Sequence, residues 1–328
     1  LRSKKEAYSV SEMKLGRFVM QTKVVKRKGK WKQFIPVYLM MLPGLLYLFI
    51  NNYMPMAGLV VAFKQVNFST GIWKSPWVGL KNFEFLFTTD EAAVITRNTI
   101  LYNLAFIVIG IVLGIFLAIL ITEVANKTLK KLYQSAILVP FLMSIVIVSY
   151  IVYAFLGAEH GLINNSVLPM LGKEPVSWYT RPQYWPFILV FVHTWKGIGY
   201  GCLIYISTIN GIDKSLYEAA SLDGAGILKQ IRYVTLPCLK GTVITLTLLN
   251  IGKIFYADFG LFYQVPMNSG QLYDTTNVID TYVYRALLQL GNSGMAAAAG
   301  FYQSVVGFVL VMISNLIVRK TSSENALF

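Results

Sequence analysis

Six long apolar segments constrain this chain more than any other feature of its sequence. A helix needs about 20 mostly apolar residues to cross the hydrocarbon core of a bilayer. Backbone groups in lipid must be hydrogen-bonded within the segment, so helices are the expected structure. The sequence therefore predicts an all-α membrane protein with six transmembrane helices, the first interrupted near Asn51, Asn52 and Pro55. The predicted spans are 34–63, 99–122, 133–156, 185–209, 241–264 and 296–318.

The distribution of charge predicts how these helices are oriented. Only 13% of the residues are charged, against about 25% in a soluble domain. Of the 29 Lys and Arg, eleven fall in the first 33 residues, and nine more fall in the loops after the second and fourth spans and after the last. The opposite loops hold seven. Because cytoplasmic loops of membrane proteins are enriched in Lys and Arg, both termini are predicted to be cytoplasmic. The net charge of +14 is then a topology signal and not a nucleic-acid footprint.

Several kinds of catalytic or metal site are missing from the sequence. His160, His193, Cys202 and Cys238 form no CxxC or His-Cys cluster, so neither a zinc site nor a disulfide framework is expected. The phosphate-binding pattern GxxxxGK[ST] is also absent, so no nucleotide or other cofactor is expected on this chain. The basic N-terminal stretch has no short apolar core followed by A-x-A, so no cleavable signal is expected.

The loop at 215–237, on the predicted cytoplasmic side, has an unusual pattern for a connector. The Glu-Ala-Ala run at 218–220 favours helix, and Gly224 interrupts it. Apolar residues at helical spacing through 227–234 predict a second helical stretch. Pro237 is expected to end that stretch just before the next span. The loop should therefore form a short amphipathic helix, a bend and a second helix along the membrane face.

This loop resembles the EAA loop of binding-protein-dependent ABC importer permeases. The family pattern is Glu-Ala-Ala, three residues, Gly, nine residues, an aliphatic residue, one residue and then Leu-Pro. Val234 stands where Ile is usual, which is a conservative departure. The positions that match, together with the Asp of the Asp-Gly-Ala form common in the family, are Glu218, Ala219, Ala220, Asp223, Gly224, Leu236 and Pro237.

The resemblance extends over nearly the whole chain. It points to the carbohydrate subgroup, whose members import oligosaccharides and polysaccharide fragments, alginate among them. The fold implied is the type I ABC importer transmembrane domain, over 34–320, with a basic N-terminal segment at 1–33 and a tail at 321–328. The further stretches that resemble this subgroup are 43–49, 53–58, 62–64, 77–83, 278–285 and 296–300.

The resemblance also implies partners and a mechanism. The helix at 215–226 would be a coupling helix in a cleft of a cytoplasmic ABC ATPase, with Glu218 facing basic or polar groups there. Two such ATPase subunits would bind the ATP and Mg²⁺, and this chain would be non-catalytic. A second homologous permease, expected to be a different chain, would complete the pore. An extracytoplasmic solute-binding protein would meet the long outer loops at 64–97, 157–184 and 265–295. The location implied is the bacterial cytoplasmic (inner) membrane.

Two lysines within the predicted spans indicate where substrate could pass. Lys196 and Lys253 would lie roughly 16–18 Å deep at 1.5 Å rise per residue, near the middle of the bilayer. Ionisable groups at that depth usually serve function or are buried in the bundle. On a continuous fifth span, Asn250, Lys253 and Tyr256 would share one face. The candidate substrate-pathway residues are Asn250, Lys253, Tyr256, Lys196, His193, Trp195, Tyr200 and Asp258.

These lysines favour a carboxylated sugar, such as a uronate oligomer, because sugars need polar groups and aromatic faces and a carboxylate adds a need for positive charge. Three alternatives for each lysine stay open: pairing with a backbone carbonyl, pairing with Asp258, or snorkelling. Two other classes of protein are alternatives to an ABC importer permease. An ion-coupled secondary transporter of sugars would use inverted repeats and midplane carboxylates, and only Asp258 lies well inside a span. A polysaccharide-cleaving enzyme would need paired carboxylates, whereas the acidic residues are scattered.

Overall fold

The computed structural model describes residues 31–67, 69–289, 291–321 and 326. The basic segment 1–33 therefore lies outside the described residues except for the backbone of 31–33, and of the tail 321–328 only 321 and 326 are described. The chain divides into two units, Leu1–Ala57 and Gly58–Phe328.

The first unit contains helix α2 (Trp31–Leu48) and the π-helical turn η1 (Phe49–Tyr53). The following 3₁₀ helix, η2 (Met54–Phe63), crosses into the second unit. Together they make a 30-residue candidate span, Phe34–Phe63. The change from α to π to 3₁₀ geometry falls at the predicted interruption, because Pro55 has no N–H to continue the α-helical pattern.

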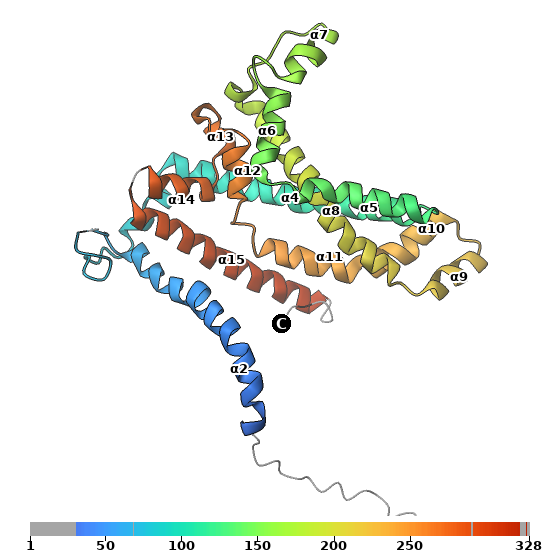
Figure 1. Ribbon diagram of the computed structural model, residues 1–328, viewed down its shortest axis with the longest axis horizontal. Coiled ribbons are helices and arrows are strands. Elements are labelled where there is room, and N and C mark those ends of the chain that lie inside the picture. Colours follow the sequence, from blue (N-terminus) through green and yellow to red (C-terminus); the bar gives the residue numbers. More distant parts are fainter. Residues whose placement is uncertain (1–30, 68, 290, 322–325, 327–328) are drawn as a thin grey trace, which may run out of the picture. The chain divides into compact units, whose positions relative to one another are not determined.

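Four long helices form the framework of the second unit. They are α4 (Asp90–Thr122), α8 (Trp185–Asn210), α11 (Leu236–Ile251) and α15 (Ser293–Thr321). Helix α4 packs beside α8, and α11 lies beside α15 (Figure 1). Helix α8 also packs on α5 (Lys127–Leu142). At that crossing a Cβ on Gly199 would overlap the Ile137 carbonyl, so glycine permits the close approach.

The third predicted span, 133–156, is not one straight helix. Helices α5 and α6 (Ile145–Leu156) meet at an angle of 95°. Pro140 lies in the last turn of α5, and Met143 is extended with ψ 140°. Ser144 then starts α6 by accepting a hydrogen bond from the Ile147 amide at 3.3 Å. The proline and the new cap stop one helix and begin another, which produces the bend.

The fifth predicted span, 241–264, is wrong at both ends. Its helix begins at Ile227, in α10 (Ile227–Gln230), and runs on through the π-helical turn η7 (Ile231–Thr235) into α11. Pro237 therefore does not end a helix: the π turn bonds the Leu236 amide to the Ile231 carbonyl and accommodates the missing N–H one residue later. The helix stops at Ile251, and α12 (Phe259–Gln264) begins after a seven-residue interruption, 252–258.

Short elements make up the segments that the sequence predicts to be outer loops. They are η3 (Lys81–Phe83), α3 (Phe85–Thr88), η4 (Ile163–Val167), α7 (Leu168–Met170), η5 (Trp178–Thr180), η6 (Pro182–Tyr184), η8 (Gly270–Leu272), α13 (Tyr273–Thr276) and α14 (Ile279–Leu288). A further short helix, α9 (Lys214–Leu222), follows α8. Within the described residues the only β pairing is an isolated bridge between Lys64 and Trp77. In the part of the chain that the structure describes, five helices are long and apolar enough to cross a membrane, or six if the bent pair is one span. The predicted all-α membrane class is confirmed.

Candidate functional site

A cavity of about 330 Å³ lies between α4, α8 and the interruption at 252–258. Its wall combines amide, imidazole, ammonium, phenol and carboxylate groups with three apolar side chains. The residues that line it are Asn103, Phe106, Ile107, His193, Asn250, Lys253, Tyr256, Ala257 and Asp258. Five of the eight predicted pathway residues thus come together from two helices and a turn: His193, Asn250, Lys253, Tyr256 and Asp258.

The predicted helical face of Asn250, Lys253 and Tyr256 does not exist, because α11 ends at Ile251. Tight turns replace it. The Lys253 amide donates to the Asn250 carbonyl at 3.0 Å, and the Tyr256 amide donates to the Lys253 carbonyl at 2.8 Å. Asp258 then caps α12 by accepting from the Leu261 amide at 3.1 Å. The three side chains still reach one cavity, but through the turns of 252–258.

Two neighbours fix the orientation of aromatic groups at the cavity. The ring of His193 stacks on Phe106 with a centroid distance of 3.6 Å and an interplanar angle of 11°. The hydroxyl of Tyr256 lies 2.8 Å from the Ser304 hydroxyl on α15. The cavity wall is therefore preorganised, with a flat imidazole face on one side and a held phenol on the other.

The two lysines have different surroundings. Lys253 is exposed and lines the cavity, where Asp258 also lies. Among the described residues the one ion pair within 4.0 Å joins His160 and Glu159, so no carboxylate neutralises Lys253 directly. Lys196 instead donates to the Phe141 carbonyl at 3.2 Å, with its ammonium 5.5 Å from the centre of the Phe141 ring. It lines neither this cavity nor its neighbour, and its contacts match the carbonyl-pairing alternative.

A second cavity, of about 230 Å³, shares His193 and Asn250 with the first. Tyr200 lines it and stacks on Phe141 at 5.1 Å. Trp195 lines neither cavity and packs against the apolar core. The sequence argument missed Asn103, on α4, and Ser304, on α15. Both are polar residues inside long apolar helices, a signal that the sequence does contain.

The loop that resembles the EAA motif forms helix α9, a turn and the start of the fifth span. Asp213 caps α9 by accepting from the Ser215 amide at 2.9 Å. Hydrogen bonding to the backbone and side chain of Ser215 lowers the pKa of the exposed Asp213 carboxyl. Gly224 ends the helix with φ +75°, and the Ala225 amide bonds to the Ala220 carbonyl. The side chains of Glu218, Ala219 and Asp223 are exposed, as are Gly224, Leu236 and Pro237, and Ala220 is half-buried.

Apolar side chains on this segment are unusually exposed. Leu222 is 89% exposed and Leu228 is 83% exposed. Leu216 and Ile227 are also exposed. A cluster of exposed apolar residues around a short helix is typical of a protein–protein contact surface.

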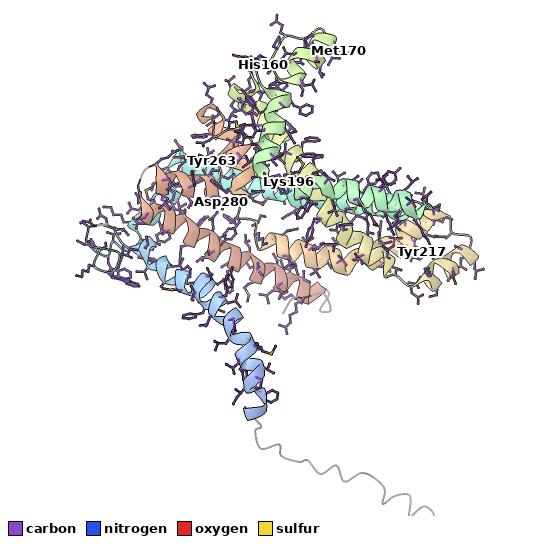
Figure 2. All side chains as sticks on the ribbon, viewed as in Figure 1. His160, Met170, Lys196, Tyr217, Tyr263 and Asp280 are labelled. Carbon is purple, nitrogen blue, oxygen red and sulfur yellow. The ribbon has the colours of Figure 1, made fainter. Side chains whose placement is uncertain are left out.

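Two side-chain contacts brace α9 against the start of the fifth span. The Tyr217 hydroxyl lies 3.0 Å from the Thr235 hydroxyl. The Gln230 side-chain amide donates to the Ser221 hydroxyl and to the Ala225 carbonyl, both at 2.9 Å. Tyr217 lies at the α9 end of the second unit, away from Lys196 and Asp280 (Figure 2). The helix and the base of the span are thereby tied into one unit.

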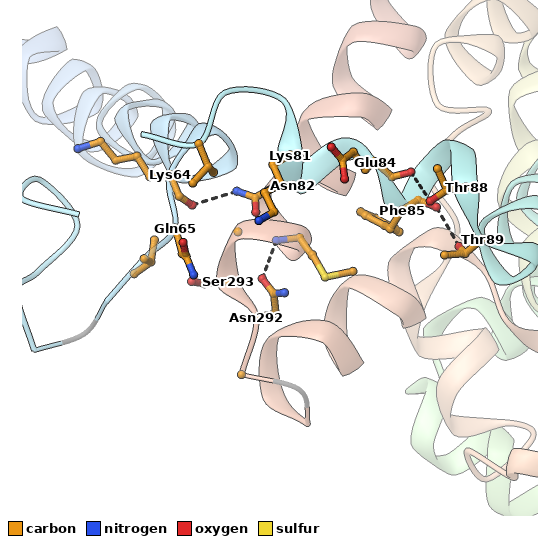
Figure 3. Close-up of a pocket in the computed structure, with 15 residues that line it drawn as sticks. Lys64, Gln65, Lys81, Asn82, Glu84, Phe85, Thr88, Thr89, Asn292 and Ser293 are labelled. Carbon is orange, nitrogen blue, oxygen red and sulfur yellow. Dashed lines mark hydrogen bonds between the residues drawn. The ribbon is translucent and has the colours of Figure 1, made fainter. Parts of the chain in front are cut away.

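A larger polar pocket, of about 570 Å³, lies between the segments 64–66 and 78–89 and the start of α15 (Figure 3). Asn82 holds its floor by donating to the carbonyls of Ala62 and Lys64, each at 2.9 Å. Lys64 is buried and donates to the carbonyls of Ile72 and Trp73. Asn292 caps the Met295 amide at 3.0 Å. The pocket therefore lies in the predicted outer loop region and is built by side-chain-to-backbone contacts.

Membrane-length helices around a polar cavity, with an exposed and braced helix between two of them, define an integral-membrane transport subunit. The chain belongs to the family of binding-protein-dependent transport system inner membrane components, whose model matches residues 110–323. This family is a component of ABC transporters, so the alternative of an ion-coupled secondary transporter no longer stands.

Relatives narrow the class of substrate to sugars. The chain is 34% identical to the polygalacturonan/rhamnogalacturonan transport system permease protein YteP of Bacillus subtilis (strain 168), over 88% of this chain and 89% of that protein. Its fold matches a crystal structure of a bacterial ABC transporter involved in the import of the acidic polysaccharide alginate, with TM-score 0.81 and 32% identity, covering 89% of this chain and 97% of that one.

A second similar structure is the bacterial alginate ABC transporter in complex with an alginate pentasaccharide-bound periplasmic protein, with TM-score 0.80 and 32% identity, covering 89% of this chain and 96% of that one. The resemblance to sugar ABC permeases is confirmed. This chain is an inner-membrane permease subunit of a sugar ABC importer.

Proposed function

We propose that this permease carries an acidic oligosaccharide, a uronate oligomer such as a fragment of alginate, across the inner membrane. The observation that carries the proposal is Lys253, which lines the cavity without a carboxylate partner. Lys253 is exposed at this cavity, so its ammonium is open to a ligand that supplies negative charge. Asn103, Asn250 and Tyr256 would bond sugar hydroxyls, and the His193 face would pack against a pyranose ring.

Two relatives support this class of substrate independently. The alginate transporter imports what its description calls an acidic polysaccharide. A polygalacturonan, by its name, is a chain of galacturonate units, each with a carboxylate. The two sugars share the carboxylate and differ in stereochemistry, so the charge is the common requirement that Lys253 would meet.

The proposed mechanism is ATP-driven alternating access. Helix α9 docks in a cleft of a cytoplasmic ABC ATPase through Glu218, the small residues Ala219 and Ala220, and the exposed Leu222, and the exposed Leu228 of α10 extends the contact. Two ATPase subunits bind ATP and Mg²⁺ and move this helix as they close. The brace passes that motion to the fifth span, and the helices rock about the cavity.

Two further partners complete the proposed assembly. A second, different permease subunit supplies the other half of the pore, since the exposed apolar helix faces of one chain do not enclose a substrate. A solute-binding protein delivers the sugar to the outer loops, where the 570 Å³ pocket lies. The proposed assembly has both termini of this chain in the cytoplasm, in keeping with the excess of Lys and Arg in the predicted inner loops.

The test uses the whole importer in proteoliposomes, with ATP inside and solute-binding protein outside. Binding protein loaded with a uronate oligomer is expected to stimulate ATP hydrolysis and uptake, while a neutral oligomer of equal length should give little of either. The purified chain alone should not hydrolyse ATP. Equal uptake of the neutral oligomer, with both sugars bound by the binding protein, would refute the acidic substrate but not the ABC permease assignment.

A further inference from the structure

The interruption of the fifth span leaves backbone groups that need partners. Irregular backbone at membrane depth is tolerated where it is buried in protein or lines a cavity and where its N–H and C=O groups are bonded. Turns satisfy the amides of Lys253, Ile254 and Tyr256. The Ala257 amide and the Phe255 carbonyl are different, because their partners come from distant parts of the chain.

Two side chains bond these groups. The Asp280 carboxylate, on α14, accepts from the Ala257 amide at 2.7 Å. The Gln303 side-chain amide, on α15, donates to the Phe255 carbonyl at 2.7 Å and to the same Asp280 oxygen at 3.0 Å. Gln303 is 3% exposed. Asp280 and Gln303 therefore hold both sides of the peptide that carries Tyr256, and we name this pair the clip.

The clip itself is firmly seated. Asp280 lies in the first turn of α14, where the helix dipole favours a carboxylate (Figure 2). The same helix is anchored by Thr281, whose hydroxyl donates to Asn277, and by Arg285, which stacks on Tyr273 at 4.3 Å. Burial nevertheless raises the pKa of the Asp280 carboxyl. Burial therefore disfavours the charged form of Asp280, and the hydrogen bonds from Ala257 and Gln303 to its oxygen offset part of that cost.

We infer that Asp280 and Gln303 are positioning residues that keep 252–258 non-helical and so hold Lys253, Tyr256 and Asp258 at the cavity wall. Without the clip, the Ala257 amide and the Phe255 carbonyl lose their hydrogen-bond partners. The segment 252–258 is then free to move or to become helical. The inference rests on the proposed function only for the part that these side chains play in transport. The hold on the segment is a statement about structure and is tested separately.

The test measures how closely Tyr256 is held to α15 in the assembled importer. Tyr256→Cys and Ser304→Cys are combined in a Cys238→Ser background, which leaves Cys202, a buried thiol. A bifunctional thiol reagent about as long as the missing tyrosine ring should join the two introduced thiols readily, because in the native protein that ring carries its hydroxyl to within 2.8 Å of the Ser304 hydroxyl. Adding Asp280→Ala should slow this crosslinking about tenfold, since it removes a half-buried carboxylate that accepts two hydrogen bonds.

Two matched variants show whether the effect comes from the hydrogen bonds that Asp280 accepts and not from any substitution of an aspartate in this region. Asp280→Asn keeps an acceptor oxygen for both donors and should restore the crosslinking rate. Asp274→Ala, an exposed outer aspartate on the neighbouring α13, should leave it unchanged. Gln303→Ala removes the bonds to Phe255 and to Asp280 but leaves the one between Asp280 and Ala257. It should also slow the reaction, so it carries the test if Asp280→Ala does not assemble. If Asp280→Ala and Gln303→Ala crosslink as fast as the parent, the clip is refuted.

Uptake by the same clip variants, without the cysteines, separates the clip from the proposed function. If 252–258 line the substrate pathway, Asp280→Ala should lower uptake and Asp280→Asn should restore it. Slower crosslinking with unchanged uptake would support the clip and refute the assignment of this cavity to substrate. Unchanged crosslinking would refute the clip whatever the transported sugar.

Discussion

At the scale of single residues, two lysines that look alike in the sequence differ in their contacts. Both are expected at similar depths in apolar segments. Lys196 donates a hydrogen bond to the Phe141 carbonyl at the end of α5, where the bend to α6 leaves carbonyls without helical partners. Lys253 lines the polar cavity and has no carboxylate within ion-pair distance among the described residues. One lysine therefore serves the fold, and the other is available to a ligand.

Lys253→Gln is expected to lower uptake of a uronate oligomer about tenfold while changing uptake of any neutral sugar much less, because an ionic hydrogen bond to a carboxylate is worth about 1.5–3 kcal/mol. Uptake into proteoliposomes with each sugar at several concentrations measures this. Lys196→Gln is the matched control, since its amide can still donate to Phe141. It should leave the preference between the two sugars unchanged. Equal losses for both sugars in Lys253→Gln would contradict the charge argument.

At the scale of elements, α9 and the fifth span form one mechanical piece. The sequence predicted two helices along the membrane face, with a stop at Pro237. The structure instead continues the second of these helices through a π turn into the span, as far as Ile251. A displacement of α9 would therefore reach the cavity along one continuous helix. The hydrogen bonds of Tyr217 and Gln230 hold α9 and its following turn against the start of the fifth span.

Tyr217→Phe should raise the number of ATP molecules hydrolysed for each sugar imported, by about twofold to fivefold, because one hydrogen bond of roughly 1 kcal/mol stiffens the brace. ATP hydrolysis and uptake are measured in the same proteoliposomes. Thr235→Val removes the other partner and should have a similar effect. The double variant should be no worse than either single one if the two hydroxyls act together. Additive losses would mean that the residues act separately.

At the scale of the whole molecule, charge and span count together determine the expected orientation. Six spans in the described residues, with the bent pair counted as one, predict that both ends of the chain lie on the same side of the membrane. The excess of Lys and Arg in the predicted inner loops puts that side in the cytoplasm. With this predicted orientation, the polar 570 Å³ pocket and the exposed α9 would lie on opposite sides of the membrane.

The native thiol of Cys238 tests this orientation. Cys238 is exposed and follows Pro237 directly, so it is expected on the cytoplasmic side. A membrane-impermeant maleimide should leave it unlabelled in intact spheroplasts and label it after permeabilisation. Asp274→Cys in a Cys238→Ser background should show the reverse, with labelling in intact spheroplasts. Labelling of Cys238 before permeabilisation would invert the topology and place α9 out of reach of any cytoplasmic ATPase.

The sequence by itself determined the class of fold, the approximate spans and the region that resembles the EAA loop. These depend on local information: apolar length, charge next to spans, and a pattern at fixed spacing. It also named five residues that line the cavity, since polar groups inside apolar helices are unusual. It misplaced the end of the helix near Lys253, because that end depends on which distant groups bond the freed backbone, and it did not predict the bend between α5 and α6.

The tertiary structure alone decided which of those polar residues meet. Asp280 and Gln303 are distant in sequence from Ala257 and Phe255, and no local pattern links them. Only the packing of α14 and α15 against the fifth span brings their side chains to its broken backbone. The helix gives way at 252–258 because partners elsewhere in the fold replace the hydrogen bonds that it loses, and such partners can be recognised only once the chain is folded.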